Sequence, residues 1–229
     1  MKIKNLKTYL EAYPWAYIQF GIIFNKLKKR QTSRFVTVKT DITIEGFPRS
    51  SNSYLSRLVR HLNPKLQIAT HLHSNANVVQ SLKWNIPTVV LIRNPKDAIV
   101  SLAALTHEID TRKNNPLRKI DFDKSIRDYI RFYKPLLKSK DKFITAHFNE
   151  VVTNPVAIIK EINTKTNLSL SEKADMNDFE RVLDSGKEFH ILPNKTRESL
   201  KSNIKKEFSN YINSNDFLEA VALYKAFIS

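Results

Sequence analysis

The transition from a short apolar run to a helix start near the middle of the chain constrains the fold most. Residues 88–92, Thr-Val-Val-Leu-Ile, have the length and β-branched composition of a buried strand. Arg93 follows at once, and Asn94 then suits a helix N-cap, with Pro95 at the first helical position. Ser101 lies about two helical turns further on. The strand-end arginine and this hydroxyl can converge on one anion, although an ion pair with a nearby carboxylate explains Arg93 equally well.

A second transition from strand to helix lies upstream. Residues 41–45 alternate their branched side chains as a strand does, and residues 46–53 form a short polar loop. Residues 54–62 then place leucine and valine at i, i+3, i+4 and i+7, which predicts an amphipathic helix. Such a junction points backbone N–H groups and the positive end of the helix dipole at one spot. The sequence therefore predicts a second anion site.

The polar loop differs from a nucleotide P-loop, G-x-x-x-x-G-K-[ST], at two positions. Gly46 and Ser53 fit its ends, but Ser51 stands in place of the second glycine and Asn52 in place of the lysine. The missing lysine argues against an ordinary ATPase or GTPase, and Arg49 supplies a cation instead. If position 51 needs a positive φ, serine is strained there.

Both segments resemble the cofactor motifs of sulfotransferases. Residues 47–54, Phe-Pro-Arg-Ser-Ser-Asn-Ser-Tyr, resemble the 5′-phosphosulfate loop of that family, and residues 93–101 resemble its 3′-phosphate motif, Arg-(Asn/Asp)-Pro-x-Asp-x-x-x-Ser. Between them, residues 69–74 are similar to a Thr-His-Leu segment that carries a basic histidine, and residues 146–155 resemble a later strand and helix start. The resemblance covers residues 41–155, is weaker beyond, and is nearer to the short bacterial and viral members.

The resemblance implies transfer of a sulfuryl group from 3′-phosphoadenosine 5′-phosphosulfate (PAPS) to an acceptor hydroxyl or amine, leaving 3′-phosphoadenosine 5′-phosphate (PAP). His71 matches the family's general base. His73 is the second candidate for this role, because alternate residues of a strand share a face. Arg49 would stabilise charge on the leaving phosphate and so counts as catalytic. The residues expected to bind the donor are Arg49, Ser50, Ser51, Asn52, Ser53, Tyr54, Arg93, Ser101 and Arg197. No metal site is predicted.

Several departures from the family pattern keep other functions open. Ser51 replaces a glycine, Ala69 a lysine and Phe148 a tyrosine, and residues 193–201 replace a glycine-rich basic segment. In that last region Lys195, Arg197 and Lys201 either close over the donor or form a solvated helix face. A P-loop-like nucleotide or small-molecule kinase and a non-catalytic binder of an acidic polymer are the alternative functions. Glu45 and Glu150 are alternative bases.

The alternation of strands and helices predicts an α/β fold with a P-loop-like, mainly parallel sheet, helices on both faces and a helical C-terminal part. We expect a single sulfotransferase domain over residues 1–229, with an N-terminal helical and aromatic segment (1–34), a donor-binding core (35–155) and a helical part (156–229). The expected strands are 42–46, 66–70, 88–92 and 143–148, with a further hairpin strand at 35–39; the expected helices are 53–62, 75–84, 95–105 and 122–137. An amphipathic stretch at 217–227 should dock on the domain.

The composition limits the chemistry and the partners. Cysteine is absent, which excludes disulfides, thiolate metal sites and thiol catalysis. The net charge of +16 (38 Lys+Arg against 22 Asp+Glu) exceeds what one donor needs. Compositional drift is the favoured explanation, ahead of an acidic glycan, nucleic acid or anionic membrane. We expect a small-molecule or glycan acceptor and no specific nucleic acid. The loops 106–117 and 184–192 are expected to choose the acceptor.

Residues 13–24 near the N-terminus are apolar and aromatic. The basic residues 25–30 follow them, where a signal peptide would have a small-residue cleavage site. The run is also shorter than the ~20 residues of a spanning helix. We therefore expect a cytoplasmic protein. The segment is either a helix packed on the protein's own core or an aromatic, lysine-flanked surface that touches a membrane peripherally.

Overall fold

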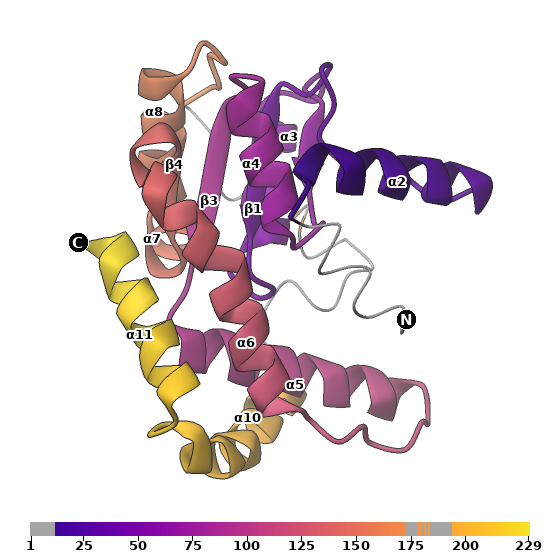
Figure 1. Ribbon diagram of the computed structural model, residues 1–229, viewed down its shortest axis with the longest axis vertical. Helices are drawn as coiled ribbons and strands as arrows, with labels where there is room; N and C mark the ends of the chain where they lie inside the picture. Colours follow the sequence, from indigo (N-terminus) through magenta and orange to yellow (C-terminus); the bar gives the residue numbers. More distant parts are fainter. Residues whose placement is uncertain (1–11, 173–177, 180, 182, 184–193) are drawn as a thin grey trace.

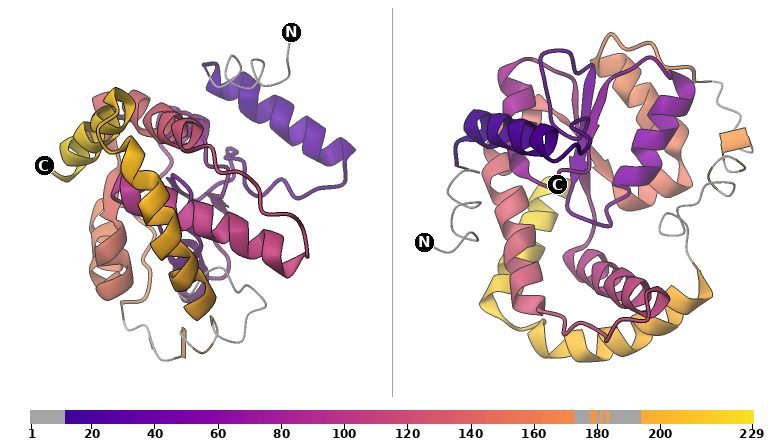
Figure 2. Two further views of the ribbon diagram at one scale, coloured as in Figure 1. Left: turned by 90° about the horizontal axis from the view of Figure 1, so that it is seen from below. Right: turned by 90° about the vertical axis from the view of Figure 1, so that its right-hand side faces the viewer.

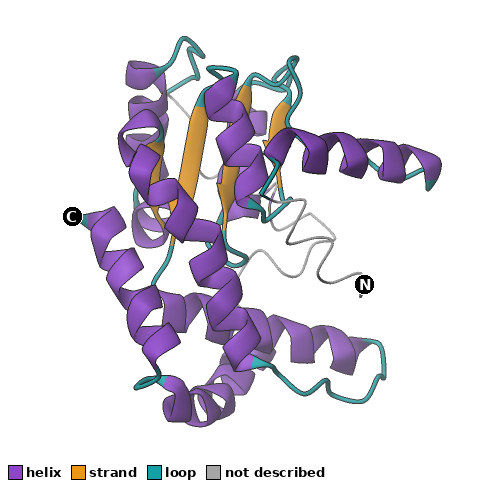
Figure 3. Ribbon diagram, viewed as in Figure 1, coloured by secondary structure: helices purple, strands orange, loops and turns teal. Residues whose placement is uncertain are grey.

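The computed structural model describes residues 12–172, 178, 179, 181, 183 and 194–229. Its centre is a four-stranded sheet in the order β2-β1-β3-β4, in which every neighbouring pair is parallel (Figures 1 and 3). The strands are β1 (Ile42–Gly46), β2 (Ile68–Thr70), β3 (Thr88–Ile92) and β4 (Ile144–His147). All carboxyl ends therefore lie at one edge, which is where open α/β sheets bind ligands.

Helices cover both faces of the sheet, as the right-hand view of Figure 2 shows. The helices are α2 (Pro14–Leu27), α3 (Asn52–Leu62), α4 (Asn75–Lys83), α5 (Pro95–Arg112), α6 (Phe122–Tyr133), α7 (Phe148–Thr153), α8 (Pro155–Lys165), α10 (Lys195–Phe208) and α11 (Asn215–Ile228), with 3-10 turns at Lys134–Lys142 and Ser209–Tyr211. Alternate residues of β3 face opposite sides. Val89 and Leu91 join a core with α3 and α8, whereas Val90 and Ile92 join a core with α5 and α6. The predicted α/β class is confirmed.

The C-terminal helix docks as the sequence predicts. Helix α11 begins at a Ser214 cap, whose hydroxyl accepts from the N–H of Phe217. It buries Phe217, Leu223 and Phe227, and the ring of Phe227 lies 5.5 Å from that of Tyr133 on α6. Helices α10 and α11 thus enclose α5 and α6 at the end of the molecule beyond the strands (Figure 1).

Three expectations about elements are wrong. Residues 35–39 form turns rather than a strand, because Phe35 and Val36 are buried against α2 and the N–H of Val36 donates to Asn77 Oδ1. Helix α5 continues to Arg112, so residues 106–112 of the expected acceptor loop are helical. Helix α6 ends at Tyr133, since Pro135 lacks an N–H and the chain tightens into a 3-10 turn.

The N-terminal helix α2 packs on the core, which confirms the interpretation of residues 13–24 as a helix packed on the protein's own core. Ile18 is fully buried in a cluster with Phe35, Ala69 and others. A Cβ at Gly21 would lie 2.4 Å from the ring of Phe35, so glycine is what permits this close approach. Within the described residues, no helix is both long and apolar enough to cross a membrane.

Candidate active site

The loop between β1 and α3 has the unusual backbone that the sequence suggests. Arg49 and Ser51 both have left-handed conformations, with φ of 71° and 75°. Such conformations cost non-glycine residues energy and recur at ligand-binding loops. Ser51 is the N-cap of α3 yet makes no capping bond, and its Oγ is buried without a hydrogen-bond partner among the residues that the structure describes. Asn52 braces the loop by donating from Nδ2 to the carbonyl of Phe47 at 3.2 Å. The loop is therefore strained and braced, with a buried hydroxyl at a helix N-terminus.

The second motif joins this loop at the same edge of the sheet. Asn94 caps α5 by accepting from Lys96 N, and Pro95 takes the first helical position, as expected. Arg49 Nε donates to Ser101 Oγ at 3.1 Å, and Arg93 Nη1 donates to the Arg49 carbonyl at 2.9 Å. These contacts cross 52 and 44 residues of sequence. The two anion motifs thus form one cluster, because β1 and β3 are neighbours.

The ring of Phe148 also contacts the Arg93 guanidinium. The carbon Cζ of Arg93 lies 3.7 Å above the centre of the Phe148 ring, within cation–π range. Ile92 pairs with His147 in the sheet, so the residues that follow β3 and β4 meet. The sequence pattern treats Phe148 only as a departure from tyrosine. The expected strands that end near Ile92 and near Phe148 were the signal that could have placed Phe148 beside Arg93.

Glu108 is a counter-ion that sequence reasoning missed. Its Oε2 lies 2.8 Å from Arg197 Nε, and both side chains are 1% exposed. Arg112 and Asn194 also donate to Glu108. This buried ion pair joins α10 to α5. Direct contact between Arg197 and the sulfuryl donor stays a prediction. The neighbouring Lys195 is exposed. Lys201 pairs with Glu198 at 2.6 Å.

The cluster concentrates positive charge away from water. Burial, followed by repulsion from Arg197 and Arg93, lowers the pKa of Arg49 to about 10, and Glu108 opposes this. Burial also lowers the pKa of Arg93. A bound polyanion would offset both effects, so the cluster is suited to a multiply charged anion.

The two histidines lie in a loop rather than in a strand. Strand β2 ends at Thr70, and His71 and His73 have φ of 64° and 53°. The expectation that they share the face of a strand is therefore wrong. Their rings still lie together, with centroids 5.8 Å apart. His71 Nε2 lies 2.8 Å from Ser53 Oγ on the first turn of α3, so His71 contacts the anion loop.

His73 has a defined tautomer. Its Nδ1 lies 2.9 Å from the carbonyl oxygen of Gly46. Because a carbonyl can only accept, Nδ1 carries the hydrogen, and Nε2 is the basic nitrogen of the neutral ring. This is the arrangement of a general base whose second nitrogen is oriented by the backbone.

Glu45 holds the histidine loop from inside the protein. Its two carboxylate oxygens accept from Leu72 N at 2.9 Å and from His73 N at 3.1 Å, and Asn77 Nδ2 donates to it at 2.9 Å. Burial raises the pKa of Glu45 to about 7, against the opposing effect of these hydrogen bonds. Glu45 thus positions the loop. The other alternative base, Glu150, is exposed on α7.

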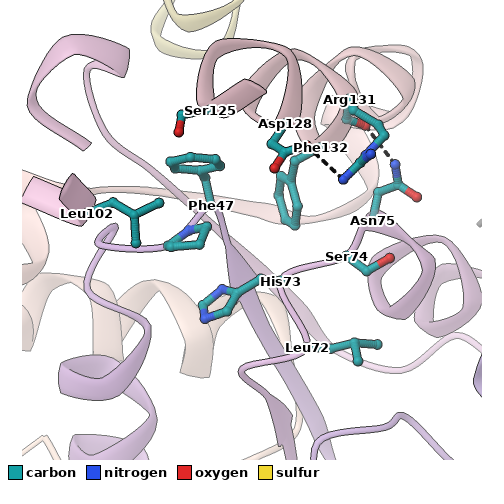
Figure 4. Close-up of a pocket in the computed structure, with 11 residues that line it drawn as sticks. Phe47, Leu72, His73, Ser74, Asn75, Leu102, Ser125, Asp128, Arg131 and Phe132 are labelled. Carbon is teal, nitrogen blue, oxygen red and sulfur yellow. Dashed lines mark hydrogen bonds and ion pairs between the residues drawn. The ribbon is translucent and has the colours of Figure 1, made fainter. Parts of the chain in front are cut away.

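A cavity of about 180 Å³ opens beside His73 (Figure 4). Phe47, Leu102 and Phe132 form its apolar wall, while Asp128 and Arg131 of α6 form an ion pair of 3.0 Å at its polar side. The other lining residues are Pro48, Leu72, Ser74, Asn75 and Ser125. Residues 106–117, expected to choose the acceptor, do not line this cavity, and residues 184–192 fall outside the described residues.

Helix α6 also anchors both motifs, which the sequence did not indicate. The hydroxyl of Tyr133 donates to the carbonyl of Leu91 at 2.7 Å and accepts from Phe47 N at 3.2 Å. The hydroxyl of Tyr129 donates to the Arg93 carbonyl at 2.8 Å. In the sequence, the spacing of these tyrosines indicates only an ordinary apolar helix face. Two further residues were expected to bind the sulfuryl donor. Ser50 is fully buried, and Tyr54 packs edge-on against Phe179, with ring centroids 5.3 Å apart.

Comparison with solved structures adds a distant likeness. No family model matches the chain, and neither does any curated protein. Among solved structures, the chain is similar to mouse sulfotransferase SULT7A1 complexed with PAP, at 14% identity and a TM-score of 0.48. The match covers 86% of this chain and 92% of that one. This likeness is too distant to assign a family.

Proposed function

We propose that this protein is a sulfotransferase that moves a sulfuryl group from PAPS to an acceptor hydroxyl or amine. One observation carries the proposal. The two sequence motifs that resemble a 5′-phosphosulfate loop and a 3′-phosphate site meet through Arg49, Ser101 and Arg93, next to a cavity that contains His73.

The residues fit a donor with two anionic ends. Arg49, the first N–H groups of α3 and the Ser51 hydroxyl suit the phosphosulfate end, since a helix N-terminus and a cation favour an anion there. Arg93 and Ser101 suit the 3′-phosphate, with the guanidinium oriented by Phe148. The crowding of Arg49, Arg93 and Arg197 gives the site an excess of positive charge that a multiply charged donor would balance.

The chemistry follows from these positions. PAPS supplies, when bound, a sulfuryl group attached to a phosphate leaving group. Arg49 stabilises the charge that develops on the leaving oxygen. His73 Nε2 accepts the proton of the acceptor, while the bond from Nδ1 to the Gly46 carbonyl steadies the resulting imidazolium. Positioning and charge stabilisation are the main requirements, as in phosphoryl transfer.

The choice of base differs between the sequence and the structure. The Thr-His-Leu pattern ranks His71 first. The geometry favours His73, because His73 lines the cavity and His71 contacts Ser53 of the anion loop. We therefore propose His73 as the base and His71 as a positioning residue of the donor side, with Glu45 holding the loop that carries both.

Calorimetric titration with PAP, AMP and ATP-Mg tests the donor assignment. We expect PAP to bind without a metal and AMP to bind far more weakly, because AMP lacks the 3′-phosphate. Equal affinity for AMP would contradict the role of Arg93 and Ser101. Tighter binding of ATP-Mg than of PAP would favour a kinase. Binding of PAPS without PAP release in the presence of any acceptor, together with tight binding of a sulfated polymer, would favour the non-catalytic alternative.

A further inference from the structure

Helix α2 carries an apolar face that the core does not cover. Residues 13, 16, 17, 20, 23, 24 and 27 recur at the helical spacing of i, i+3, i+4 and i+7, although Tyr17, at the border of this stripe, packs partly against the core. Within this face Leu27 is 79% exposed, Ile23 57% and Phe20 53%. The buried Ile18 lies on the opposite side of the helix. Helix α2 is therefore apolar on two sides, only one of which is docked.

The position of α2 leaves this face accessible. One end of the helix packs against α4, and α2 then runs at a steep angle to α4 and projects beyond the sheet (Figures 1 and 2). Phe20 and Phe24 stack on it with ring centroids 6.2 Å apart. Lys28 Nζ lies 4.7 Å from the centre of the Phe24 ring. A cation thus lies over one of the exposed rings.

The described segment that carries this face has charged side chains of one sign. Residues 12–40 contain six lysines and arginines and no aspartate or glutamate. Four of them follow the apolar face directly and are exposed: Lys26, Lys28, Lys29 and Arg30. A second copy of the chain would bring the same cations together and be repelled, whereas an anionic surface would be attracted. Exposed aromatic residues flanked by lysines are the pattern of a helix that lies in a membrane interface.

We propose that the exposed face of α2, formed by Tyr13, Phe20, Ile23, Phe24 and Leu27, docks on an anionic lipid surface with the cations of residues 26–30 at the headgroups. The rings enter the boundary of headgroups and acyl chains, and the lysines contact the phosphates and carboxylates of the lipids. This surface is separate from the donor cluster, so the proposal does not depend on sulfuryl transfer.

Co-sedimentation of the full chain with lipid vesicles tests this docking. The vesicles are phosphatidylcholine alone or phosphatidylcholine mixed with phosphatidylserine. We expect binding to the mixed vesicles and weak or no binding to the neutral ones. Phe20→Ser/Phe24→Ser should lower vesicle affinity about tenfold or more, through lost apolar burial. Lys28→Gln/Lys29→Gln should lower it about fivefold for each lysine, and added salt should reduce the difference.

The matched control is Leu218→Ser on α11, because Leu218 is also an exposed leucine (54%) on a helix. Leu218→Ser should bind vesicles like the wild type, whereas Leu27→Ser should bind more weakly. Circular dichroism and PAP titration confirm that the variants are folded. Equal binding to both vesicle types, or equal losses in Leu27→Ser and Leu218→Ser, would overturn the proposal. So would a dimer in gel filtration that Phe20→Ser/Phe24→Ser dissociates, since a second copy would then occupy the face.

Discussion

The donor side and the acceptor side of the candidate site are built in different ways. The donor side consists of two short contiguous segments that follow neighbouring strands, and Arg49, Arg93 and Ser101 meet because β1 and β3 are paired. The acceptor side takes its wall from five separate places: the β1 loop, the histidine loop, the start of α4, α5 and α6. The proposed anion contacts thus come from two local sequence segments, whereas the cavity depends on how α6 packs over the sheet.

The largest expected effect tests which histidine belongs to the acceptor side. His73→Ala should lower the rate of sulfuryl transfer ~10²–10⁴-fold, because it removes a positioned base. Its PAP affinity should stay at the wild-type level. His71→Ala should weaken PAP binding instead, since His71 contacts Ser53 of the donor loop. Turnover and calorimetry on both variants are the measurements. An inactive His71→Ala beside an active His73→Ala would restore the order that the sequence pattern predicts, and full activity in both would transfer the role to a carboxylate, with Glu45 tested next.

The next effect tests the donor side. Arg93→Ala should weaken PAP binding by ~2–5 kcal/mol, as expected for a desolvated charge pair. Lys96→Ala is the control, because Lys96 lies three positions further along, at a position where the motif specifies no residue. Calorimetric titration measures both. Similar losses in the two variants would show that Arg93 acts only through general charge.

A third effect concerns Glu45, which lies between the two sides. Burial raises its pKa from 4.5 to about 7, so the folded protein keeps this proton between those values while the unfolded chain releases it. The contribution of Glu45 to the free energy of unfolding should therefore fall as the pH rises from about 4.5 to about 7, by up to about 3 kcal/mol. Urea denaturation across this range should show a flatter profile for Glu45→Gln. Glu150→Gln, at an exposed position, should keep the wild-type profile. A Glu45→Gln profile that overlays the wild type would contradict the raised pKa.

The smallest effect tests the support that Phe148 provides. Phe148→Leu should weaken PAP binding by about 1 kcal/mol, because the cation–π contact with Arg93 is lost. Phe148→Tyr keeps an aromatic ring and should bind PAP like the wild type. A leucine variant with unchanged affinity would show that the Arg49 carbonyl alone orients the guanidinium.

The predictions of elements succeeded where the signal was local. β1 and β3 have the predicted boundaries, because β3 is a short apolar run and β1 alternates branched side chains up to Gly46, and both strands are covered on both faces. The starts of α5 and α8 follow from Asn94 with Pro95 and from Asn154 with Pro155. The strand expected at 35–39 failed because its apolar residues are buried by α2 rather than by a neighbouring strand.

In the candidate site too, contacts within one local segment could be predicted from the sequence, and long-range contacts could not. The sequence predicted that Arg93 and Ser101 lie near one another, because a strand end and the second turn of the next helix have a fixed separation. In the structure Arg49 contacts both of them. The role of Glu45 could not, since its partners Leu72, His73 and Asn77 lie 27 to 32 residues away. The pairing of β1 with β2 and the packing of α4 against β1 bring them together. The same holds for Glu108 with Arg197, which are 89 residues apart.

The sequence by itself determined the two anion motifs, the helix caps and the apolar runs of the sheet, because each depends on residues within about two helical turns of one another. Only the tertiary structure decided the tautomer of His73, the burial of Glu45, the ring beneath Arg93 and the wall of the cavity. Each of these depends on long-range hydrogen bonds or packing, for which neither residue of the pair carries a pattern of its own. The exposed face of α2 depends on both the sequence and the fold. The helical spacing of its apolar residues is visible in the sequence, but only the fold shows which side of the helix the core leaves uncovered.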